Sequence, residues 1–268
     1  MHTIFTAALL LCALSACSSD SSKKENETTQ TEQKVEVDIS TSNLPIPDNR
    51  FANNYQVLMF GNSHTSGLDT LIQTLIIVGN SAAEIEVINA GGGYLSNSSS
   101  QQRRIELLEN HSWTHIILQG QKYSQSGAVN YPTAPAKTWI SKAKSLAITP
   151  ILFPEHPQKG NADEGKRLQQ LHLEISSKQR ACVAPIGLTW DDVIMTDPKI
   201  DLHQLDGNHA SLIGRLLSAY VFYEVITGNA ADLLPYIDTI DVDEPTQQLL
   251  KQIASATIQS NPPCNFDE

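Results

Sequence analysis

Positive charge is scarce in this sequence, and long apolar runs are missing from most of it. Of its 268 residues, 18 are Lys or Arg against 29 Asp or Glu, which gives a formal net charge of −11. Affinity for nucleic acid comes chiefly from basic side chains that neutralise phosphates, so an acidic chain with no basic cluster excludes that partner. Beyond the N-terminus no apolar run is long enough to cross a bilayer, which excludes an integral membrane architecture.

The apolar run at residues 4–14 is too short for a spanning helix, and a strongly polar stretch follows it. This pattern predicts a signal peptide over residues 1–16. The sequence Leu14-Ser15-Ala16-Cys17 resembles the lipobox of bacterial lipoproteins, which implies an acyl chain on Cys17. A plain signal peptide with an incidental cysteine is the alternative.

Residues 18–34 contain no apolar or aromatic side chain, so this segment cannot bury enough surface to offset its ordering entropy. We expect a disordered tether over residues 17–50. Ser18, in place of an aspartate after the cysteine, resembles the outer-membrane sorting pattern. The chain is thus expected in the bacterial cell envelope, at the outer membrane or facing the periplasm, as a monomer held to the membrane through its lipid anchor only.

Cysteine is rare, with four residues in all. Cys12 falls in the predicted signal peptide and Cys17 at the lipid site, which leaves Cys182 and Cys264 in an oxidising compartment. A disulfide between them is one expectation. The other is that Cys182 is a buried strand thiol, because a free cysteine packs as a small apolar side chain.

Residues 51–268 read as a single α/β domain with a C-terminal extension. Short apolar runs alternate with segments of helical period, as expected for parallel strands covered on both faces by crossover helices. The predicted strands cover residues 55–60, 85–89, 115–119, 150–153 and 182–186. The predicted helices cover residues 70–77, 101–109, 136–147, 164–178, 212–227 and 246–258. The pattern predicts a three-layer α/β/α fold with a central five-stranded parallel sheet.

Two polar segments carry the chemistry. Gly61-Asn62-Ser63 follows the first predicted strand, at the sheet edge where open α/β folds bind ligands. Far downstream, Asp206 and His209 are three residues apart, so one turn can hold the carboxylate against the imidazole while the other ring nitrogen faces Ser63. This arrangement predicts a Ser-His-Asp triad, whereas a helix cap at Ser63 and a plain surface turn at Asp206 are the structural alternatives.

Over residues 55–228 these segments resemble the SGNH (GDSL-type) hydrolase superfamily, which shows Gly-Asp-Ser or Gly-Asn-Ser in its first block and Asp-x-x-His in its last. The resemblance implies a flavodoxin-like fold and catalytic Ser63, Asp206 and His209. It also implies an oxyanion hole made by the amides of Ser63 and Gly93, with Gly92 as the second choice, and by the side chain of Gln121. Gln121 stands where the family has Asn, and Gln119 is the competing donor.

The resemblance implies a serine hydrolase that cleaves carboxylic esters through an acyl-enzyme, with a small-molecule or glycan ester as substrate. A carbohydrate O-acetylesterase is the leading expectation. Acyl transfer to a glycan, a lipase or lysophospholipase activity, and a non-catalytic glycan-binding protein are the alternatives. His64, His203 and the pair Glu155-His156 lack a tight metal-ligand spacing, so we expect neither a metal nor a cofactor.

Overall fold

The computed structural model describes residues 43–266. Its centre is a sheet of five parallel strands in the order β2-β1-β3-β4-β5. The strands are β1 (Asn54–Gly61), β2 (Glu84–Gly92), β3 (His115–Leu118), β4 (Thr149–Leu152) and β5 (Cys182–Val183). The predicted five-stranded parallel sheet is therefore confirmed. Since all strands are parallel, their carboxyl ends share one edge, and the loops that follow them meet there.

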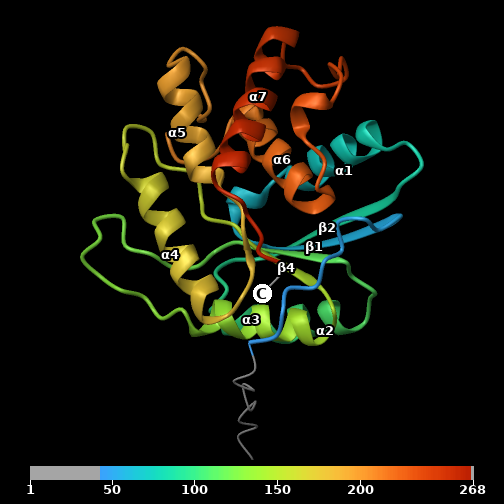
Figure 1. The fold of residues 1–268 in the computed structure, drawn as a ribbon. Coiled ribbons are helices and arrows are strands. Elements are labelled where there is room, and N and C mark those ends of the chain that lie inside the picture. Colours follow the sequence, from blue (N-terminus) through green and yellow to red (C-terminus); the bar gives the residue numbers. More distant parts are fainter. Residues whose placement is uncertain (1–42, 267–268) are drawn as a thin grey trace, which may run out of the picture. The chain divides into compact units, whose positions relative to one another are not determined.

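Helices cover both faces of the sheet (Figure 1). One face carries α1 (Leu68–Gly79), α5 (Ile186–Thr196), α6 (Leu212–Thr227) and α7 (Glu244–Ser260). The other carries α2 (Gln101–Glu109), α3 (Ala134–Ser145) and α4 (Glu164–Lys178). Two apolar cores result, one on each side of β1, because alternate side chains of a strand point to opposite faces. Val57 and Met59 belong to the larger core, Leu58 and Phe60 to the smaller.

The sequence prediction is wrong after β5. Residues 182–186 were expected to form one strand, but the ladder ends at Val183 and helix α5 starts at Ile186. Pro185 explains the break, because it has no N–H for the ladder and its fixed φ suits the entry to a helix. Sequence reasoning did not predict α5.

The predicted tether is also wrong at its C-terminal end, since residues 43–50 lie against the domain. Lys144 Nζ donates to Asn43 Oδ1 at 2.9 Å and to the Leu44 carbonyl at 2.7 Å. The Asn49 side chain donates to the Thr114 carbonyl at 2.9 Å. The domain thus begins before residue 51. The signal peptide, Cys17 and the rest of the tether lie outside the described residues.

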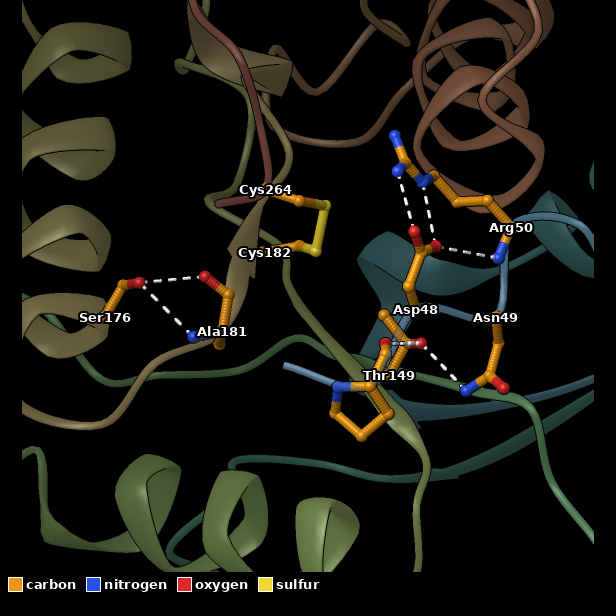
Figure 2. The surroundings of a disulfide bond; sticks show 9 residues. Asp48, Asn49, Arg50, Thr149, Ser176, Ala181, Cys182 and Cys264 are labelled. Atoms are coloured by element: carbon orange, nitrogen blue, oxygen red, sulfur yellow. Dashed lines mark hydrogen bonds and ion pairs between the residues drawn. A yellow bond between two sulfur atoms is a disulfide. The ribbon is translucent and has the colours of Figure 1, made fainter. Parts of the chain in front are cut away.

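The C-terminal tail is fixed to the last strand. Cys182 and Cys264 form a disulfide, which Figure 2 shows beside β5. Next to it, the Val183 N–H donates to the Pro263 carbonyl at 2.7 Å. The structure therefore holds the disulfide and not the free buried thiol. Within residues 43–266, no helix has the length and apolar content needed to cross a bilayer.

Candidate active site

The nucleophile candidate lies on a sharp turn between β1 and α1. Asn62 caps a short 3₁₀ turn that starts at Ser63, and its side chain accepts the His64 N–H at 2.9 Å. Residue 61, directly before Asn62, must be glycine, because a Cβ on Gly61 would collide with Gln119 and Thr65. The turn leaves Ser63 exposed at the carboxyl edge of the sheet.

The loop before α6 positions the other two residues. Asp206 Oδ1 accepts the N–H groups of Asn208 and His209, both at 2.9 Å. Its second oxygen, Oδ2, lies 2.5 Å from His209 Nδ1. Hydrogen bonds from the His209 ring and from the two amides hold the pKa of Asp206 well below its usual range. The carboxylate is therefore ionised and fixes Nδ1 as the protonated ring nitrogen.

The two segments meet at the triad. His209 Nε2 lies 2.8 Å from Ser63 Oγ, although 146 residues separate them in sequence. With the Nδ1 proton held by Asp206, Nε2 is the basic nitrogen and accepts the Ser63 hydroxyl proton. The structure thus brings together all three residues that the sequence predicts for the triad.

A buried polar network supports the serine turn from below. Gln119 Oε1 accepts the Asn62 N–H at 2.7 Å, and Gln119 Nε2 donates to Glu155. Burial raises the pKa of Glu155 to about 7, against the effect of hydrogen bonds from Asn62, Gln119 and Tyr123. Sequence reasoning considered Glu155 as a metal ligand or as part of the substrate cleft and favoured a solvated loop, but its distance from Ser63 in the sequence left no local signal for this contact.

His64 adds a neutral ring to the same region. Its ring stacks against His209, with centroids 5.4 Å apart, and its Nε2 lies 3.7 Å from Glu155 Oε2. Burial, and then the nearby His209, lower the pKa of His64 to about 4. An uncharged ring next to His209 avoids a second positive charge when His209 takes the serine proton.

A cavity of about 730 Å³ opens beside the triad. Its walls are polar side chains and three tyrosines, with no aliphatic side chain among them: Asn62, His64, Tyr94, Lys122, Tyr123, Ser124, Gln125, Ser126, Tyr131, Glu155, Gln158 and Asn208. Half of these residues come from the long connection between β3 and α3. Sequence reasoning missed the residues of this connection because no spacing rule links a loop to the nucleophile of another strand.

The remaining histidines near the site have structural partners. His156 stacks on Trp190 with centroids 4.0 Å apart, and its Nε2 lies 3.0 Å from the Asn208 carbonyl. His203 Nε2 lies 2.8 Å from the Pro157 carbonyl. In the part of the chain that the structure describes, no three His, Cys, Asp or Glu side chains are grouped so that they could hold a metal ion.

Comparison with known proteins adds a structural likeness. No family model and no curated protein matches the sequence. A DUF4886 family protein from Bacteroides uniformis superposes with a TM-score of 0.60 at 15% identity, covering 80% of this chain and 98% of that one. A variant of Axe2, an acetyl xylan esterase from Geobacillus stearothermophilus, gives 0.53 at 15% identity and covers 64% and 94%. A protein from Slackia heliotrinireducens, provisionally assigned to the SGNH hydrolases, gives 0.51 at 20% identity and covers 64% and 98%.

The chain has the SGNH hydrolase fold. The sheet order and the place of Ser63 after β1 agree with the fold that the sequence resemblance implies. At these identities the likeness concerns the fold alone, and the chemistry has to be argued from the residues.

Two residues that the SGNH resemblance assigns to the oxyanion hole are engaged elsewhere. The Gly93 N–H donates to the Gly61 carbonyl at 2.8 Å. Gln121 Nε2 donates to the carbonyls of Lys122 at 2.8 Å and Pro132 at 3.2 Å. The competing Gln119 is held under the turn by its own two bonds. In this SGNH fold, none of these three groups is free to bind an oxyanion.

Proposed function

We propose that the protein is a serine hydrolase that cleaves carboxylic esters through an acyl-enzyme. The observation that carries the proposal is the continuous chain of contacts from Ser63 Oγ to His209 at 2.8 Å and from His209 to Asp206 at 2.5 Å. A helix cap or a ligand-binding loop needs no proton relay, so this geometry favours catalysis over the non-catalytic alternative.

The contacts define the order of proton transfers. Ser63 Oγ attacks the ester carbonyl while His209 Nε2 takes its proton, and Asp206 stabilises the imidazolium. The tetrahedral intermediate then expels the alcohol, which takes that proton from His209. A water molecule repeats the sequence on the acyl-serine, and the carboxylic acid leaves.

For the substrate we propose small acyl esters, acetyl above all, on carbohydrates. The cavity beside Ser63 presents hydroxyl, amide and tyrosine groups, which suit the hydroxyl-rich surface of a sugar. An aliphatic acyl chain would find no aliphatic wall there, which disfavours the lipase alternative. The acetyl xylan esterase of the same fold is consistent with this substrate class. Acyl transfer to a sugar would use the same triad, with a hydroxyl in place of water.

The test is loss of the nucleophile. The Ser63→Ala variant should lose hydrolysis of p-nitrophenyl acetate and labelling by a fluorophosphonate, with an unchanged far-UV circular dichroism spectrum. A Ser66→Ala variant, three residues along the same turn, is the matched control and should label as the wild type does. Labelling that persists in the Ser63→Ala variant would overturn the assignment. Release of acetate from acetylated xylan, compared with release from an acetylated lipid, tests the substrate class.

A further inference from the structure

Arg104 is buried beneath the glycine-rich loop that follows β2. It lies on α2 with 1% of its surface exposed. Its guanidinium donates to the carbonyls of Gly91 at 2.7 Å, Gly93 at 2.9 Å and Tyr94 at 3.0 Å. The group also lies 4.9 Å from the ring centroid of Phe60. One side chain therefore fixes the direction of three peptide groups in this loop.

The loop sequence leaves room for this side chain. A Cβ on Gly92 would lie 2.7 Å from Arg104 Nε, and the φ of 96° at Gly92 is strained for other residues. Burial lowers the pKa of Arg104 to about 10, so the guanidinium keeps its charge at neutral pH. Gly92 thus serves to admit a buried cation, which accounts for a glycine that sequence reasoning considered only as an oxyanion donor.

The fixed carbonyls determine where the amides point. In a trans peptide the C=O of one residue and the N–H of the next point in opposite directions. Since the Gly93 carbonyl faces Arg104, the Tyr94 N–H points away from it. The Leu95 N–H donates to the Gly120 carbonyl at 3.0 Å. The amides of Tyr94 and Ser63, by contrast, have no hydrogen-bond partner within residues 43–266.

The loop is also joined to the serine turn. The 2.8 Å bond from the Gly93 N–H to the Gly61 carbonyl places Tyr94 beside the turn that carries Ser63. Tyr94 and Asn62, the neighbour of Ser63, line the same cavity. Two unpartnered amides therefore border the space that an ester must enter to reach Ser63.

We infer that the Tyr94 N–H, together with the Ser63 N–H, binds the oxyanion, and that Arg104 is the positioning residue that holds the Tyr94 amide in place. This inference rests on the proposed ester hydrolysis. When Ser63 Oγ bonds to the carbonyl carbon, the carbonyl π electrons move to the oxygen, and the two N–H groups stabilise that charge. When the intermediate collapses, the charge returns to the carbonyl and the alcohol leaves with the proton from His209. The backbone N–H of Tyr94 thus takes the oxyanion-binding role predicted for the amide of Gly93.

The first test removes the guanidinium. Arg104→Met keeps an unbranched side chain but frees the three carbonyls, so we expect kcat for p-nitrophenyl acetate to fall by about 10²-fold with little change in KM. Lys251→Met is the matched control: Lys251 is a buried cation on α7 that donates to the Leu234 carbonyl, far from the triad in sequence. The control should lower the melting temperature and leave kcat unchanged.

The second test removes one amide hydrogen. Replacing Tyr94 by its α-hydroxy acid analogue turns that amide into an ester without changing the side chain. We expect kcat to fall by about 10²- to 10³-fold, as for loss of one oxyanion donor. The same exchange at Leu95 breaks the bond to Gly120 and, like the exchange at Tyr94, weakens one carbonyl that accepts from Arg104, so it is the matched control and should change kcat by less than about three-fold.

The outcomes separate the two proposals. A wild-type protein that neither labels with a fluorophosphonate nor hydrolyses the ester would overturn the proposed function. An active wild type whose Tyr94 ester keeps full kcat would overturn the oxyanion assignment alone. If Arg104→Met does not fold, the Tyr94 ester decides the donor, and Arg104→Lys, which keeps the charge but not the three-carbonyl contact, tests the positioning role through its kcat.

Discussion

The two segments that meet at the triad are held in different ways. The serine turn rests on buried side chains from other strands, since Gln119 is fully buried and Glu155 is 8% exposed. The loop of Asp206 and His209 lies at the surface, where Leu205 is fully exposed. Asp206 and His209 are joined by hydrogen bonds within a few residues, and His156, Gln158 and Lys159, from the segment after β4, bond to the loop at Asn208 and Gly207. The nucleophile is therefore supported by buried side chains, whereas the contact of Asp206 with His209 is formed at the surface within one turn.

This difference predicts how substitutions in each of the two segments affect activity and stability. A substitution in the local loop changes the proton relay and leaves the fold intact, because little is buried there. A substitution under the serine turn changes stability and rate together, because the same contacts maintain both. The following predictions sharpen that contrast.

The largest effect is expected at Asp206. Asp206→Asn keeps the size of the side chain but presents an amide to His209 Nδ1, so the ring loses the tautomer that leaves Nε2 basic. We expect kcat to fall by about 10³- to 10⁴-fold with an unchanged melting temperature. Steady-state kinetics and a thermal melt check both halves. A large drop in melting temperature would contradict the local character of this loop.

The next effect is expected at Gln119. Gln119→Ala leaves the Asn62 N–H without its acceptor and removes one of the hydrogen-bond donors to Glu155, so the free energy of unfolding should fall by about 1–3 kcal/mol. Because the serine turn shifts as well, kcat should fall by about 10- to 100-fold.

Gln121→Ala is the matched control for that variant. Its side-chain amide binds the carbonyls of Lys122 and Pro132, so kcat should stay within about three-fold of the wild type. Denaturant titrations and kinetics on both variants make the comparison. A larger loss of kcat at Gln121 than at Gln119 would restore the oxyanion role that the sequence predicts for Gln121.

The last effect concerns stability and not rate, and it is a change in pH dependence at Glu155. Its pKa is raised from 4.5 to about 7 by burial, so the folded protein binds more protons than the unfolded chain between these values. The stability contribution of the protonated carboxyl is full below pH 4.5 and is lost as pH rises to about 7. Glu155→Gln removes this dependence, and its stability relative to wild type should improve by about 3 kcal/mol between pH 4 and pH 8. Urea titrations at several pH values measure it, and parallel pH profiles of the two proteins would contradict it.

The same contrast explains what the sequence could predict. The five strands could be predicted from hydrophobic periodicity, and the pair Asp206 and His209 from its spacing. Both are local properties of the sequence. The hydrogen bonds of Glu155, the contacts of Arg104 with the glycine-rich loop and the lining of the cavity depend on which loops the sheet brings together. The helix α5 was missed because the apolar run through Pro185 suits a buried strand and a buried helix equally well.

The oxyanion hole shows most clearly what could not be predicted from the sequence. A family pattern selects Gly93 and Gln121 by their positions in the chain, but a hydrogen bond needs a direction as well as a position. The direction of each amide depends on where Arg104, 11 residues beyond Gly93, holds the carbonyls. No property of the residues at 93 or 121 contains that information.

The disulfide at Cys182 bears on how the protein avoids self-association. Strand β5 is the last of the sheet and only two residues long, and an uncovered outer strand is a template for pairing with another molecule. The tail anchored by Cys264 places the Pro263 carbonyl on the Val183 N–H at 2.7 Å and so occupies that edge with the protein's own chain. Oxidation of two cysteines 82 residues apart thus closes a sheet edge that the reduced chain would leave open to pairing with another molecule.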